Sequence, residues 1–234
     1  MPAGKELAFK YYFMFEDGTR ATYEICLDRE TLFLKPERKI QSSSWTRLEH
    51  HKCNNCPLNE SDHADCPLAL NLSAVVPRFS KMFSYEKVNV LVETETRTYS
   101  KNTTLQSGLS SMLGIYMVTA GCPIMDRLRP MVRFHLPFAT IEETVFRSVS
   151  TYLLGQYFEH KKGRSPDLTL KGLMDGYQQI QMVNHGLAGR MRSIVDKDAN
   201  LNALVVLDVF AKELPFSIES SLENLEYLFS PPAV

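Results

Sequence analysis

The chain has 234 residues, of which 44% are hydrophobic and 23% charged, so it can bury a sizeable core. Its 26 basic and 27 acidic residues leave a net charge of −1, which excludes the broad positive field of a dedicated nucleic-acid-binding protein. We therefore expect no nucleic acid as a partner.

The start of the sequence does not resemble a secretory signal, because Lys5, Glu6 and Lys10 stand where an apolar stretch should be. The uncharged stretch 103–125 contains many Ser and Thr residues, and its apolar part extends only from Met112 to Val118. We expect a core helix there and not a membrane span. The sequence thus predicts a cytoplasmic protein without a membrane partner.

The first third of the sequence has the pattern of β-strands, taken here in chain order. Strands are predicted at 7–15, 21–27, 31–34, 88–93 and 97–99. Asp17-Gly18 is typical of a tight turn between the first two strands. A loop that begins at Ser42 leads into a cluster of cysteines before the last two strands.

From Leu105 onward the patterns indicate helices. Thr140 and Glu143 form a capping box, which opens a helix expected to end near Lys162. Apolar residues in steps of three and four predict a second helix between Leu173 and Ile194. A third helix is expected at 201–214 and a short last one after Ser220.

These elements predict an α+β fold. Residues 1–102 should form a mostly β region with an antiparallel sheet, which is interrupted by a metal-binding loop at 50–68. Residues 103–234 should form a helical half packed on that sheet, so that the two regions make one compact unit.

The cysteine cluster is the strongest functional signal. Cys53 and Cys56 form a C-x2-C knuckle, and Cys66 follows nine residues later. This spacing lets thiolates converge on one ion. Because clustered cysteines in a reducing compartment more often bind metal than form disulfides, we expect a metal site.

A tetrahedral zinc site needs a fourth ligand. Cys122 is favoured because Cys56, Cys66 and Cys122 are each followed by a proline, which prefers the first position of a helix. A thiolate there would gain from the helix dipole. His63 is the alternative fourth ligand, with His50 and His51 as further candidates.

Zn²⁺ is the expected metal, and a closed site of thiolates is usually structural. A [4Fe–4S] cluster is the alternative cofactor, which would make the protein a redox sensor. Cys26 lies inside a predicted strand and is expected to be a small buried hydrophobe.

A second candidate site lies in the segment 121–138, where Arg127, Arg129 and Arg133 stand close to His135. Arginines could hold a phosphate or carboxylate, and the histidine could act as an acid or base. Solvated arginines and a packed histidine explain the same residues without function.

Asn184 interrupts the apolar face of the second predicted helix, and His185 follows it. A buried amide needs partners, so Asn184 either lines a polar pocket or fixes the packing of the helix. An enzyme hypothesis combines His135, Glu142 and His185 as candidate catalytic residues, with Arg129, Arg133 and Asn184 binding an anionic substrate.

Three cysteine motifs and one longer segment resemble a family of uncharacterised bacterial proteins. They are Cys53-x2-Cys56-Pro57-Leu58, Cys66-Pro67, Gly121-Cys122-Pro123 and the run from Arg129 to Ala139. The resemblance covers most of the chain. It implies a cytoplasmic bacterial protein and brings no established activity.

The leading hypothesis is a soluble binding or regulatory protein stapled by zinc, with an unknown small anionic ligand or protein partner. The enzyme and the iron–sulfur sensor are the alternatives, and the sequence does not decide whether the protein is an enzyme.

Overall fold

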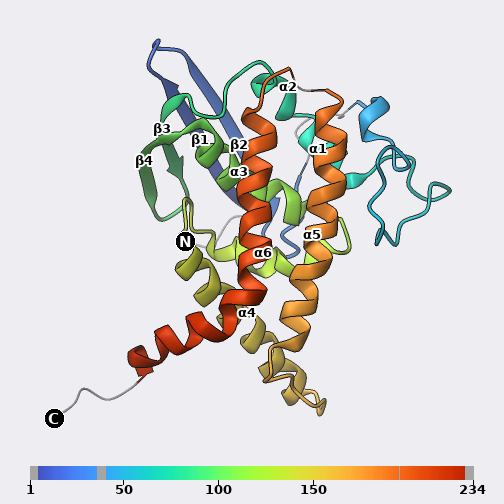
Figure 1. The fold of residues 1–234 in the computed structure, drawn as a ribbon, viewed down its shortest axis with the longest axis vertical. Helices are drawn as coiled ribbons and strands as arrows, with labels where there is room; N and C mark the ends of the chain where they lie inside the picture. Colours follow the sequence, from blue (N-terminus) through green and yellow to red (C-terminus); the bar gives the residue numbers. More distant parts are fainter. Residues whose placement is uncertain (1–4, 36–40, 195, 230–234) are drawn as a thin grey trace.

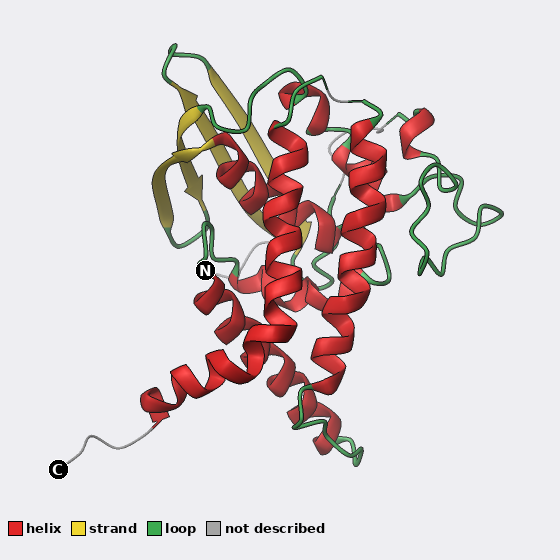
Figure 2. Cartoon of the chain, viewed as in Figure 1, coloured by secondary structure: helices red, strands yellow, loops and turns green. Residues whose placement is uncertain are grey.

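The computed structural model describes residues 5–35, 41–194 and 196–229 (Figure 1). The chain has the predicted α+β architecture, with an N-terminal antiparallel sheet followed by a helical half (Figure 2). The strands are β1 (Glu6–Phe15), β2 (Arg20–Asp28), β3 (Lys87–Glu93) and β4 (Thr98–Thr104). The α-helices are α1 (Pro67–Leu72), α2 (Val76–Phe79), α3 (Leu105–Thr119), α4 (Ile141–Lys161), α5 (Lys171–Arg192) and α6 (Ala199–Leu225). Three 3-10 helices are η1 (Ser44–Thr46), η2 (Met125–Phe134) and η3 (Glu226–Phe229).

The sheet has the strand order β2-β1-β3-β4, and every neighbouring pair is antiparallel. Alternate side chains of β1 from Leu7 to Phe13 are buried on one face, as the period of two requires. Helix α3 packs on this face. A Cβ at Gly108 would lie 2.8 Å from Val90 and 3.0 Å from Phe13, so the glycine permits the close approach.

The helical half is built around α5 and α6, which run side by side past the end of the sheet (Figure 1). Helix α6 also packs against α3 and α4, and η2 lies between α3 and α4. Helix α3, which contains the apolar part of the uncharged stretch, is largely buried. Across the described ranges, no helix has the length and apolar character needed to cross a membrane.

Several predicted boundaries are confirmed. Gly18 has a φ of 82° in the β1–β2 turn. The capping box of α4 forms, because Thr140 Oγ1 accepts from the Glu143 amide at 3.2 Å and Glu143 accepts from the Thr140 amide at 2.8 Å.

Two predicted elements are wrong. The strand predicted at 31–34 does not form, since only Leu34 makes an isolated bridge, to Leu27. The residues before it are held in a turn, in which Asp28 Oδ1 accepts from the amides of Glu30 and Thr31. The two helices predicted at 201–214 and after Ser220 are one continuous helix, α6, which η3 follows.

Candidate functional site

The loop that carries the first three cysteines is closed by a short stem. The Cys66 amide donates to the Thr46 carbonyl at 2.7 Å, and the Leu48 amide donates to the Ala64 carbonyl at 3.0 Å. The Thr46 hydroxyl donates to Asp65 at 2.8 Å. The stem fixes Cys66 beside the start of the loop, which lies on the outer side of α5 (Figure 1).

The C-x2-C knuckle is a turn, in which the Cys56 amide donates to the Cys53 carbonyl at 3.0 Å. Helix α5 is the surface on which this turn rests. Asn55 Nδ2 donates to the Gln179 carbonyl at 2.9 Å, and Gly186 leaves the space that Cys53 occupies. The small residue on α5 therefore lets the knuckle approach the helix backbone.

The sequence predicts that a helix starts just after Cys56, Cys66 and Cys122. This prediction is confirmed for Cys66 and wrong for Cys56. Cys66 is the N-cap of α1, with Pro67 at the first helical position. The Cys122 sulfur accepts from the amides of Ile124 and Met125 just before η2. Cys56 is followed by loop without regular secondary structure and not by a helix.

The structure brings Cys53, Cys56, Cys66 and Cys122 to the wall of one cavity of about 20 Å³. Leu68, Ile124, Val183 and Leu187 complete most of its lining. Burial raises the pKa of the Cys53 thiol to about 12, and the nearby thiols of Cys66, Cys122 and Cys56 contribute. The nearby Arg190 lowers this pKa in part.

The histidine alternatives for a fourth ligand lie elsewhere. His63 is exposed, and neither His50 nor His51 lines the cavity. Within the described part of the chain, no three His, Cys, Asp or Glu side chains already stand in an arrangement that holds a metal. A metal at this site would therefore require the four thiols to change their arrangement.

Arg190 is the cavity residue that sequence reasoning missed. It is 1% exposed, and its guanidinium donates to the carbonyls of Trp45, Arg47 and Leu48 at 2.9, 2.6 and 2.7 Å. Its Nε is buried without a partner among the described residues. Arg190 follows Leu187 by three positions and Val183 by seven, so the helical period could have placed it on the buried face.

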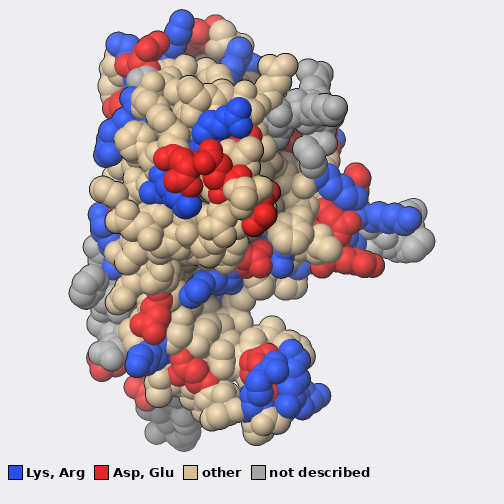
Figure 3. Space-filling view, turned by 90° about the vertical axis from the view of Figure 1, so that its right-hand side faces the viewer, with Lys and Arg blue, Asp and Glu red and all other residues tan. Residues whose placement is uncertain are grey.

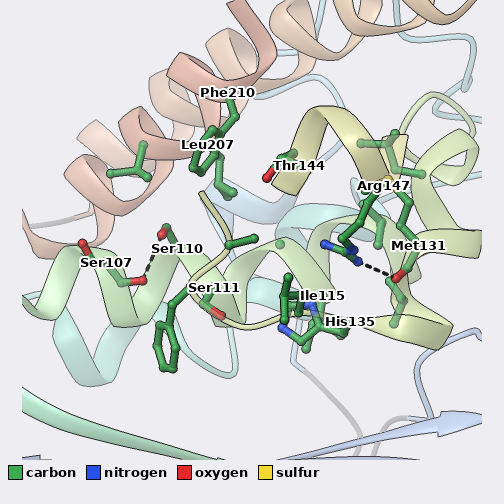
Figure 4. Close-up of a pocket in the computed structure, with 18 of the residues that line it drawn as sticks. Ser107, Ser110, Ser111, Ile115, Met131, His135, Thr144, Arg147, Leu207 and Phe210 are labelled. Carbon is green, nitrogen blue, oxygen red and sulfur yellow. Dashed lines mark hydrogen bonds between the residues drawn. The ribbon is translucent and has the colours of Figure 1, made fainter. Parts of the chain in front are cut away.

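His135 lines a separate pocket of about 280 Å³ between α3, η2, α4 and α6 (Figure 4). Its Nε2 lies 2.8 Å from the Tyr11 hydroxyl, which lies 3.0 Å from the Ser111 hydroxyl. Burial, and secondarily the charge of Arg147, lower the pKa of His135 to about 3. The ring is therefore neutral near pH 7.

The residues of the enzyme hypothesis do not line one pocket. His185 is exposed and lines a pocket formed by the cysteine loop, α5 and α6, together with Cys53 and Asp208. Glu142 is exposed in the first turn of α4 and lines neither pocket. A shared acid–base centre of His135, Glu142 and His185 therefore lacks a geometric basis.

The proposed anion-binding residues are also separated. Arg129 forms an ion pair with Asp126 at 3.1 Å and covers the ring of Phe33. Arg133 is exposed, whereas Asn184 is 2% exposed inside α5 and its Oδ1 has no partner among the described residues. The arginine that lines the His135 pocket is Arg147, which the sequence did not single out.

On the face shown in Figure 3, acidic and basic side chains are mixed among larger uncharged areas.

A family model described as a domain of unknown function (DUF6901) matches residues 9–230. Neither a curated protein nor a solved structure matches the chain significantly.

Proposed function

Because the chain belongs to the family DUF6901, whose function is unknown, we propose a function from its own residues: a binding protein stapled by one structural zinc ion. The four zinc ligands would be Cys53, Cys56, Cys66 and Cys122. The single observation that carries the proposal is that Cys122, which is distant in sequence, lines one small cavity together with the other three cysteines.

The size of the cavity favours a single ion. A volume of about 20 Å³ is close to that of one water-sized occupant. A [4Fe–4S] cluster contains eight atoms and would need a much larger space. We therefore propose zinc and keep the cluster as an outcome that the experiment can detect.

Arg190 supplies a reason for an anionic centre at this position. A buried charge is costly unless it is paired, and no carboxylate of the described residues forms an ion pair with Arg190. Zinc with four thiolates has a net charge of −2. The guanidinium at the cavity wall would offset part of that charge.

The staple would be structural. Four thiolates leave no open position for a substrate, and the apolar side chains around the cavity exclude water. Zinc would tie the loop 49–64 to Cys66 at the start of α1 and to the turn at Cys122. Cys122 lies three residues before the start of η2, whose residues line the His135 pocket, so the staple would also hold one wall of that pocket.

The proposal includes a cytoplasmic location, because thiolate ligands must stay reduced. It also includes the bacterial origin that the resemblance of the cysteine motifs implies. The partner is a small anionic ligand or a protein, without nucleic acid or membrane.

Cobalt substitution tests the site directly. Co²⁺ added to metal-free protein should give the intense thiolate-to-metal absorption of a tetrahedral four-sulfur site, and one equivalent of Zn²⁺ should bleach it. Cys122→Ser should change the spectrum, whereas Cys26→Ser on β2 should not. Identical spectra for wild type and Cys122→Ser would remove Cys122 from the site, and a brown iron chromophore would replace zinc by a cluster.

A further inference from the structure

The pocket beside His135 has the chemistry of a ligand site. We propose that it binds a small apolar monocarboxylate, with the carboxylate at Arg147 and the apolar part between α3 and α6. The inference rests on the binding function proposed above and names the class of its ligand. Figure 4 shows Arg147 and His135 on one side of the pocket and Leu207 and Phe210 across from them.

The charged residues that line the pocket favour an anionic ligand. Arg147 and Lys101 line the pocket, and no Asp or Glu is among the described lining residues. Because buried or half-buried cations gain from a paired anion, a carboxylate is the favoured partner at this end. Burial lowers the pKa of Arg147, and the charge of the Glu143 carboxylate offsets part of this shift. Glu143 already accepts from the Thr140 amide in the capping box.

Arg147 is held in place before any ligand arrives. Its Nη2 donates to the carbonyls of Met131 and Phe134, each at 3.0 Å. Among the described residues, no partner is bonded to its Nη1 or Nε. A fixed guanidinium with unused N–H groups binds a carboxylate at a low cost in conformational entropy.

His135 adds polarity without charge. The Tyr11 hydroxyl can donate to Nε2 while it accepts from Ser111, which leaves the ring hydrogen on Nδ1. The neutral imidazole then serves as a donor near Arg147 and not as a second cation. Among the described lining residues, Arg147 is the one cation that is not exposed, which suits a monocarboxylate better than a phosphate or a dicarboxylate.

The rest of the lining requires an apolar body. Ile115, Met131, Leu207 and Phe210 are among the many apolar side chains that surround the space. At roughly 30 Å³ per water-sized atom, about 280 Å³ holds a ligand of roughly nine or ten non-hydrogen atoms. Octanoate has this size, and a nucleotide or a long-chain lipid exceeds it.

The test is isothermal titration of the full chain, as purified, with octanoate, and with octanol as the neutral match. We expect octanoate to bind at least tenfold more tightly than octanol, because only the carboxylate pairs with Arg147. Affinity should rise about fourfold per methylene from hexanoate to octanoate and should not rise further at dodecanoate. Equal affinity for octanoate and octanol, or no binding of octanoate, overturns the proposal.

Gly114 gives a matched pair of variants that leaves every charge in place. A Cβ at Gly114 would lie 3.8 Å from Leu207 Cδ2, an ordinary contact, so Gly114→Ala should keep octanoate binding. Gly114→Leu should fill the pocket toward Leu207 and weaken octanoate at least tenfold. Unchanged octanoate affinity in Gly114→Leu places the ligand elsewhere and overturns the site.

Arg147→Gln and Arg147→Lys test the charge. Gln should weaken octanoate at least tenfold and leave octanol unchanged, and Lys should retain part of the octanoate affinity. Octanol binding serves as the check that the pocket of each variant is intact. An octanoate affinity that is unaffected in Arg147→Gln overturns the role of Arg147.

Zinc content is measured on the same samples. If the protein contains one zinc and does not bind octanoate, the proposed ligand class is refuted and the proposed zinc site is not. A chain that binds octanoate without any metal supports the ligand site and refutes the staple.

Discussion

Gly186 on α5 faces Cys53 so closely that a Cβ at this glycine would lie 2.7 Å from the cysteine Sγ and 3.3 Å from its Cα. A residue larger than glycine at position 186 therefore has no room while the knuckle stays in this place. Cys53 Sγ also points toward the Val183 carbonyl of the same helix, at 3.9 Å. The approach of the knuckle to α5 depends on this one small residue.

Gly186→Ala should therefore weaken metal binding. The added methyl would also lie 3.3 Å from the Cys53 Cα and 3.4 Å from its Cβ, so it should push the knuckle away from α5 and lower zinc affinity about tenfold or more. Competition with a zinc chelator measures this change. Gly155→Ala on α4 is the control, because a Cβ there meets nothing within 4 Å and the substitution should leave zinc affinity unchanged.

An unchanged zinc affinity in Gly186→Ala would contradict the contact between the knuckle and α5 in the metal-bound state.

Arg190→Met should destabilise the folded protein. The substitution keeps much of the aliphatic volume but leaves the carbonyls of Trp45, Arg47 and Leu48 without their buried donor, which should cost about 3–5 kcal/mol of unfolding free energy. Urea denaturation of the zinc-loaded protein measures the loss. Arg192→Met, two residues on and exposed, should change stability by less than about 0.5 kcal/mol.

If Arg190→Met were as stable as Arg192→Met, the buried guanidinium would not anchor the stem of the cysteine loop.

His135 predicts a dependence of stability on pH. The pKa of His135 is about 3 in the folded chain against an ordinary 6.5. Above pH 6.5 the ring is therefore neutral in both the folded and the unfolded chain, and it does not change the stability. As the pH falls from about 6.5 to about 3, only the unfolded chain takes up the proton, and stability is lost. Wild type should lose about 1–2 kcal/mol more than His135→Gln between pH 7 and pH 5.

Denaturant titrations at both pH values give this comparison. Equal losses in the two proteins would show that the ring is protonated in the folded state as readily as in the unfolded chain.

Asn184→Leu should stabilise the protein by about 1–2 kcal/mol. The amide is 2% exposed and its Oδ1 is unpaired among the described residues, so replacing it by an apolar residue of similar size removes a buried polar group. Thermal unfolding measures the gain, with Ala188→Ser on the same helix as a substitution that should give none. A loss of several kcal/mol in Asn184→Leu would show that the amide has a partner that fixes the helix.

The fold could largely be predicted because its signals are local. The alternation along β1, the turn at Gly18 and the capping box of Thr140 each depend on residues within a few positions of one another. The missing strand at 31–34 shows the limit of such reasoning. Its residues have a strand pattern, but Asp28 bonds the following amides and turns the chain.

The gathering of the cysteines at one cavity could be predicted because cysteines are chemically distinctive and three of the four lie close in sequence. The roles of Arg190 and Arg147 could not, because each binds backbone carbonyls of a segment distant in sequence. Backbone carbonyls carry no sequence signal. The enzyme hypothesis joined His135 and His185 from their residue types alone, and the fold places them at separate pockets.

The central claim is that one zinc ion is held by the four cysteines. The most direct test is elemental analysis of full-length protein purified without oxygen, together with a thiol count on the native and denatured chain. The account predicts one zinc per chain, no iron, and four thiols that become reactive only when the zinc is removed. Protein free of metal, with all its thiols reactive in the native state, would contradict it.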